Sequence, residues 1–177
     1  MSRIIAATKD KESFLYALKS KVKIIFDLSP SISDLNKKAE ECHKCGKLLF
    51  MHMDLAEGIA RDRAGLEYVR SCGIDGVIST RPQLIKMASE LGLKTVQRVF
   101  VLDSQSIDAA ASMLKTKPDM VEFMPGVISA KVIDRLKSEL NIPIIAGGLI
   151  ETEDEVRLVI EAGVSAVSTS RTNLWNL

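Results

Sequence analysis

The 177-residue sequence has no apolar run close to the roughly 20 residues that a membrane-spanning helix needs. Its first residues lack the apolar core of a secretion signal, because charged residues follow the short apolar run 4–7. Cysteine is scarce, and an odd count of three without such a signal favours reduced thiols. These absences argue against a secreted protein or a membrane partner, and we predict a cytoplasmic protein.

An excess of charge of one sign is also missing. The sequence has 24 lysine and arginine residues against 23 aspartate and glutamate residues, a net charge of +1. Nucleic-acid binding by overall positive charge is therefore excluded, and only a local patch remains open.

A second pair of metal-ligating residues is absent as well. The segment Cys42–His43–Lys44–Cys45 resembles half of a metal site, but it lies within a predicted helix and no further Cys/His pair follows at ligand spacing. We predict no metal site and no cofactor.

Short β-branched runs alternate with helical patterns along the whole sequence, without a linker. The predicted strands are 4–7, 22–28, 48–53, 76–79, 94–102, 120–124, 142–146 and 166–169. The predicted helices are 10–20, 32–45, 61–72, 81–91, 104–116, 128–140 and 152–162. This α/β order predicts one domain over 1–177, a compact (β/α)8 barrel of the TIM type; an open doubly wound sheet is the alternative.

The predicted barrel has no room for a full final helix, because only residues 171–177 follow the last strand. We expect that helix to be truncated or absent, with Trp175 and Leu177 filling the gap. A second copy of the protein would cover an open flank, so a homodimer is one expected assembly.

Glycine and hydroxyl residues mark the last two strand ends. Gly147 and Gly148 follow the strand 142–146, and Ser168, Thr169 and Ser170 end the next strand. In such barrels the loops after strands 7 and 8 commonly bind phosphate, and backbone N–H groups without a neighbouring Cβ approach an anion closely. We predict a phosphate site here; the alternative is a tight turn followed by a capped turn.

Polar residues also lie at or after the ends of other predicted strands. They are Asp27, His52, Asp54, Arg98, Glu122 and Gly126. His52 and Asp54 are two residues apart and are expected to share one strand face. Because buried charge is costly unless paired, this set predicts a site for the polar part of a small molecule. The alternative is a set of internal ion pairs such as Arg98 with Glu122, and both interpretations can hold together.

Four arginines lie near helix starts, where the helix dipole disfavours cations. They are Arg61, Arg63, Arg81 and Arg171. Their position favours a role as phosphate or RNA contacts. Exposed aromatic residues beside them, which would stack unpaired bases, are missing from the sequence.

Taken together and in order, several segments resemble the glycerol uptake operon antiterminator family over nearly the whole sequence. They are 52–55 with 57–58 and Asp62, 97–100 with 103–104, 122–126, 143–150 and 168–170. The resemblance implies a (β/α)8 barrel that binds glycerol 3-phosphate. It also implies action on the leader mRNA of glycerol genes, so that transcription reads past a terminator, without catalysis.

The alternative function is an enzyme. A phosphosugar isomerase or a prenyltransferase-like enzyme that uses glycerol phosphate would share the glycine and serine pattern. An aldolase with a Schiff-base lysine is disfavoured, because no lysine lies late in a predicted strand and Lys94 begins its strand at the opposite end of the barrel.

Overall fold

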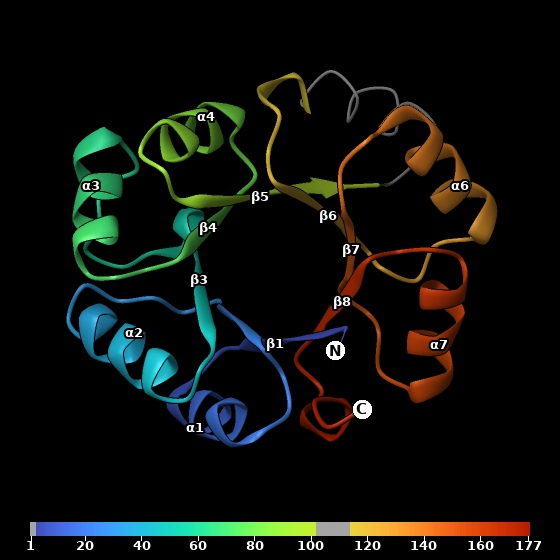
Figure 1. Cartoon of the computed structure of the whole chain (residues 1–177), viewed down its shortest axis with the longest axis horizontal. Helices are drawn as coiled ribbons and strands as arrows, with labels where there is room; N and C mark the ends of the chain where they lie inside the picture. The colour runs from blue at the N-terminus through green and yellow to red at the C-terminus, as the bar shows by residue number, and fades with distance from the viewer. Residues whose placement is uncertain (1–2, 102–113) are drawn as a thin grey trace.

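Eight parallel strands close into a barrel in the computed structural model, which describes residues 3–101 and 114–177 (Figure 1). Neighbouring strands pair in sequence order, and β8 closes the barrel on β1. The strands are β1 (Ile4–Thr8), β2 (Ile24–Asp27), β3 (Leu48–His52), β4 (Gly76–Ser79), β5 (Lys94–Phe100), β6 (Met120–Met124), β7 (Ile144–Gly147) and β8 (Ala166–Thr169). The predicted barrel is confirmed, and the open sheet is excluded.

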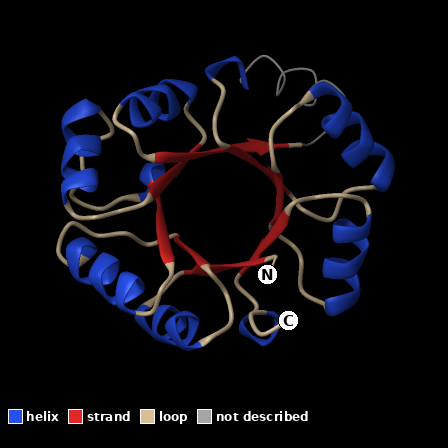
Figure 2. Cartoon of the chain, in the orientation of Figure 1, coloured by secondary structure: helices blue, strands red, loops and turns tan. Residues whose placement is uncertain are grey.

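Helices cover the outside of the barrel as a ring (Figure 2). They are α1 (Lys11–Lys19), α2 (Leu35–Lys44), α3 (Arg63–Ser71), α4 (Pro82–Glu90), α6 (Ala130–Glu139) and α7 (Glu153–Glu161). The predicted helix 104–116 lies outside the described residues up to 113, and Leu114–Thr116 forms the short 3-10 turn η2. In the part of the sequence that the structure describes, no helix has the length and apolar character needed to span a membrane.

Side-chain alternation along the strands decides which residues reach the barrel interior. Ile5, Phe26, Phe50, Ile78, Val96 and Ile145 fill its lower layers. Every second residue of a strand faces the same side. Near the carboxyl ends of the strands, the inner face therefore carries Lys9, Leu28, His52, Arg98, Glu122 and Ser168. The interior is therefore apolar below and polar at that end.

A single 3-10 turn, η3 (Thr172–Leu174), occupies the place of an eighth helix, between α7 and α1 (Figure 1). Trp175 follows it and is fully buried; its indole nitrogen donates to the carbonyl of Thr169 at 2.9 Å. Its ring centroid lies 5.8 Å from that of Tyr16 on α1. The truncated final helix and the filling role of Trp175 are confirmed. Leu177 is 44% exposed, so the expectation that it also fills the gap was wrong.

Candidate functional site

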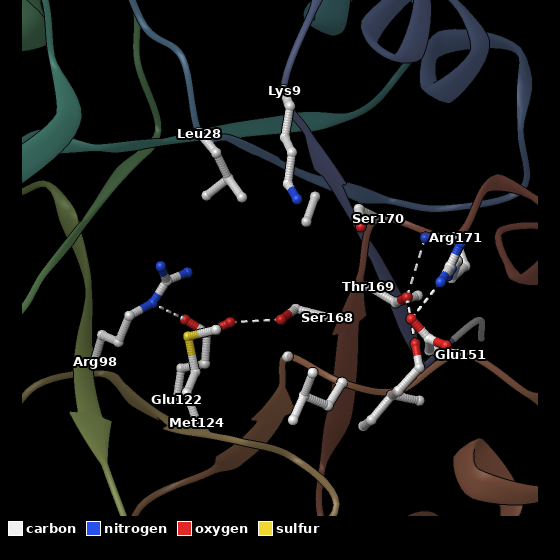
Figure 3. Close-up of a pocket in the computed structure, with 14 residues that line it drawn as sticks. Lys9, Leu28, Arg98, Glu122, Met124, Glu151, Ser168, Thr169, Ser170 and Arg171 are labelled. Carbon is white, nitrogen blue, oxygen red and sulfur yellow. Dashed lines mark hydrogen bonds and ion pairs between the residues drawn. The ribbon is translucent and has the colours of Figure 1, made fainter.

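A cavity of about 110 Å³ opens at the carboxyl end of the barrel (Figure 3). Its walls come from the ends of β1, β5, β6 and β8 and from the loop after β7. The predicted site residues that line it are Arg98, Glu122, Gly148, Ser168, Thr169, Ser170 and Arg171. The strand and loop ends singled out in the sequence therefore meet around one small space with both polar and apolar walls.

Two glycines allow the loops after β6 and β7 to approach closely. Gly147 lies beneath the cavity wall, where a Cβ would come within 2.5 Å of Glu122 Oε1 and 2.6 Å of Ser168 Oγ. Gly126 lies in the loop after β6, and its N–H donates to the carbonyl of Gly148 at 2.9 Å. Both residues shape the site through the backbone, which the sequence alone does not distinguish from direct ligand contact.

Ser168, Thr169 and Ser170 do not act alike. Ser168 and Ser170 alternate onto the inner face, whereas the Thr169 hydroxyl donates to the carbonyl of Ile150 at 2.8 Å. The same hydroxyl accepts the N–H of Arg171 at 3.1 Å. Thr169 therefore holds the loops after β7 and β8 together while its neighbours face the cavity.

A buried ion pair forms the floor of the cavity. Arg98 Nε donates to Glu122 Oε2 at 2.6 Å, and Ser168 Oγ donates to Glu122 Oε1 at 2.5 Å. Glu122 is fully buried, and Arg98 is 8% exposed. The internal ion pair is confirmed, and both partners also line the cavity. Figure 3 shows the two terminal nitrogens of Arg98 directed away from Glu122, on the side of Leu28.

Lys9 is a cavity residue that the sequence interpretation missed. It directly follows β1, and its amine points into the cavity (Figure 3). Its backbone is held on both sides, because Lys9 N donates to Ser13 Oγ at 3.2 Å and Lys9 O accepts from Ser29 Oγ at 2.7 Å. The alternation Ile5, Ala7, Lys9 was the available signal, but the predicted strand stopped at residue 7.

Asp27 and Asp54 lie outside the cavity lining. Asp27 ends β2 on the outer face and pairs with Lys38 of α2 at 2.8 Å. The expectation that Asp54 shares a strand face with His52 was wrong, because β3 ends at His52 and Asp54 lies in the 3-10 turn η1 (Met53–Leu55). The Asp54 carboxylate accepts the N–H and the hydroxyl of Thr80, at 2.7 and 2.9 Å, and so fixes the loop after β4.

The four arginines predicted as RNA contacts are exposed but engaged with oxygen acceptors. Arg61 donates to the carbonyl of Asp54 at 2.8 Å, and Arg81 Nε lies 3.6 Å from the Asp54 carboxylate. Arg63 pairs with Glu67 at 3.2 Å and with Glu90 at 3.4 Å, and Arg171 pairs with Glu151. The carboxylate contacts offset part of the positive charge of Arg63, Arg81 and Arg171, whereas the neutral carbonyl bound by Arg61 does not.

His52 is a buried histidine on the inner face of β3, with only 4% of its surface exposed. Its Nδ1 has no hydrogen-bond partner among residues 3–101 and 114–177. Burial, reinforced by the nearby Arg98 guanidinium, lowers the pKa of His52 to about 4. The imidazole is therefore neutral at physiological pH.

This environment predicts a loss of stability in mild acid. The unfolded chain takes up a proton on His52 near the ordinary pKa of 6.5, whereas the folded protein resists until about pH 4. The contribution is fully present above pH 6.5 and is lost as the pH falls toward 4, by about 3 kcal/mol in total. Urea unfolding at a series of pH values measures it. His52→Gln is expected to flatten this dependence, whereas the exposed control His43→Gln keeps it; equal profiles would contradict the assignment.

Comparisons with known proteins agree with the architecture and extend it. A family model described as glycerol-3-phosphate responsive antiterminator matches residues 4–175. The uncharacterized protein YgcP of Escherichia coli (strain K12) is 32% identical over 176 residues, which cover 98% of this chain and 92% of that protein.

Two solved structures are similar at comparable identity. A glycerol uptake operon antiterminator regulatory protein from Listeria monocytogenes str. 4b F2365 matches with a TM-score of 0.90 and 31% identity, over 97% of this chain and 94% of that one. A glycerol uptake operon antiterminator-related protein from Thermotoga maritima MSB8 matches with a TM-score of 0.87 and 31% identity, over 98% of both chains. Aldolase structures at 12–15% identity and TM-scores of 0.67–0.76 share the fold alone.

Proposed function

The chain belongs to the glycerol-3-phosphate responsive antiterminator family, and from this membership we propose that it binds glycerol 3-phosphate and acts on leader mRNA of glycerol genes. We place the ligand in the cavity at the carboxyl end of the barrel, as a regulatory signal rather than a substrate. The protein would do this work in the cytoplasm, where the transcript is made.

The cavity is small and combines two kinds of polar group, a cation and hydrogen-bonding groups, and this combination supports ligand binding. Lys9 supplies a cation, and Ser170 and the Gly148 backbone lie on the cavity wall. A phosphate over the loops after β7 and β8 would be held by these groups, since charge-assisted hydrogen bonds to phosphate are the strong ones.

Glu122 and Arg98 suit the glycerol end of the ligand. A carboxylate accepts hydrogen bonds from hydroxyls, and Arg98 donates from its terminal nitrogens. A carboxylate at this position would have to share the Arg98 guanidinium with the buried Glu122 carboxylate and would meet its like charge, which is unfavourable. The site should therefore prefer a phosphorylated polyol to a phosphorylated acid.

A thermal-shift and calorimetry panel tests the proposal. Glycerol 3-phosphate is expected to stabilise the protein more than inorganic phosphate, glycerol or 3-phosphoglycerate do, and to be recovered unchanged. Lys9→Met should weaken its binding by about 10–100-fold, because one charge-assisted contact contributes about 1.5–3 kcal/mol. Lys44→Met, on the exposed side of α2, is the matched control and should bind as the wild type does. Equal shifts for the three phosphate-containing compounds, with none for glycerol, would reduce the cavity to a general anion site.

A further inference from the structure

Large apolar side chains are exposed beside the mouth of the cavity. Phe100 is 52% exposed, Val127 is 44% exposed and Leu149 is 70% exposed. They lie at the end of β5 and in the loops after β6 and β7, three neighbouring strands of the barrel. We call these three residues the apolar arc.

Backbone contacts fix the arc as one surface. Phe100 pairs with Met124 in the register of β5 and β6. The Gly126 N–H donates to the carbonyl of Gly148 at 2.9 Å, and Val127 and Leu149 are the next residues after these two glycines. The backbone segments that carry the three residues are therefore neighbours from β5 to the loop after β7.

Leu149 is held at the rim of the cavity at a conformational cost. Its φ of 58° lies in the left-handed region, which a leucine rarely adopts. Strain of this kind is found at functional sites, where the surrounding structure maintains it. A polar ligand such as glycerol 3-phosphate would not cover the apolar side chains of the arc. An exposed apolar patch of this kind indicates binding of a second partner.

The charges beside the arc favour a polyanion over an apolar protein surface. Arg81 lies in the loop after β4, the strand that pairs with β5, and its side chain is 58% exposed with a contact of 3.6 Å to Asp54. Lys9 and Arg98 lie in the adjoining cavity. Arg98 is paired with Glu122 and Lys9 is assigned to the ligand phosphate, so Arg81 is the exposed cation that we assign to an RNA phosphate. An exposed aromatic ring with an exposed arginine after the neighbouring strand is an arrangement that binds an unpaired base together with its phosphate.

We propose that the apolar arc stacks an unpaired RNA base through Phe100, with Arg81 on a neighbouring phosphate. This assignment rests on the RNA role in the proposed function and gives that role a location. It also corrects the expectation that no exposed aromatic accompanies the arginines, since Phe100 is exposed beside the loop that carries Arg81.

The arc is built on the same elements as the ligand cavity. Arg98 and Phe100 are two residues apart on one face of β5, and Leu149 lines the cavity itself. A ligand that orders the cavity wall would therefore order the arc, and RNA binding would strengthen when glycerol 3-phosphate is present.

Fluorescence anisotropy with a labelled single-stranded RNA pool of about 20 nucleotides, and with the same length as duplex, tests the proposal, because stacking on aromatic residues tolerates sequence. Wild-type protein should prefer the single strand. Phe100→Ala should weaken binding by about 5–100-fold, the range for loss of one stacked base. Phe100→Trp should retain binding. Arg81→Met should weaken it and lower the slope of log affinity against log salt by about 1.

Leu158→Ala, which removes an exposed apolar side chain from α7, is the matched control and should bind RNA as the wild type does. Phe100→Ala should keep the thermal shift with glycerol 3-phosphate, which shows that the cavity is intact. If wild type and Phe100→Ala bind the single strand equally, the arc assignment is overturned while the proposed function stands. If the wild type binds neither this pool nor a leader transcript of the glycerol genes, with or without glycerol 3-phosphate, the RNA part of the proposed function fails and the assignment falls with it.

Discussion

Replacing Glu122 with alanine is expected to lower the free energy of unfolding by about 3–5 kcal/mol, because removing one partner of a buried ion pair leaves the other charge uncompensated. Glu122 is fully buried and bonds both Arg98 and Ser168. The variant would leave the Arg98 guanidinium inside the barrel beside an unpartnered hydroxyl. Urea unfolding followed by circular dichroism measures the loss.

A double variant separates the charge from the space that it fills. Arg98→Met with Glu122→Leu replaces the pair with apolar groups of similar volume and should regain most of the lost stability. The same double variant should no longer respond to glycerol 3-phosphate, because it lacks the groups that face the ligand. Glu67→Ala breaks the exposed pair with Arg63 and should cost less than about 1 kcal/mol. A loss of that size for Glu122→Ala would contradict the role given to the buried pair.

The fold and the core of the site follow from local sequence rules. Strand and helix periods fix the (β/α)8 order, and the inner-face alternation carries Arg98, Glu122 and Ser168 to the same end of the barrel. The ion pair was predictable because Arg98 and Glu122 lie on strands that are consecutive in sequence, and consecutive strands pair in such a barrel.

The residues whose positions were predicted wrongly lie at the ends of strands, where hydrophobic periodicity no longer determines the direction of a side chain. In the sequence, Asp54 continues the alternation of the strand that ends at His52. In the structure, η1 begins directly after His52 and turns the Asp54 carboxylate toward Thr80. Lys9 was overlooked for the opposite reason, since β1 runs one residue beyond its predicted end and places the next residue inward. Phe100 belongs to a strand whose sequence predicts burial. Its ring is exposed because it lies at the open end of the barrel.

Trp175→Ala is expected to lower the free energy of unfolding by about 3–5 kcal/mol, as for other large buried aromatic residues. The indole fills the place between α7 and α1 where a barrel of this type has a full helix, and the turn η3 is too short to cover it alone. The loss should therefore act on the packing of η3 and Trp175 against α1 and destabilise the loops that form the phosphate side of the cavity. Trp175→Phe keeps a ring but leaves the Thr169 carbonyl without its indole donor, so it should lose about 1–3 kcal/mol.

Circular dichroism is the suitable probe for this series, because the sequence has one tryptophan and its fluorescence disappears in both variants. Leu177→Ala provides the control, since that side chain is 44% exposed and should cost less than about 0.5 kcal/mol. A stability equal to wild type in Trp175→Ala would mean that the pairing of β8 with β1 closes the barrel without the indole. We expect the free energy of unfolding to rise from Trp175→Ala to Trp175→Phe to the wild type, because one side chain both fills the gap and anchors the end of β8.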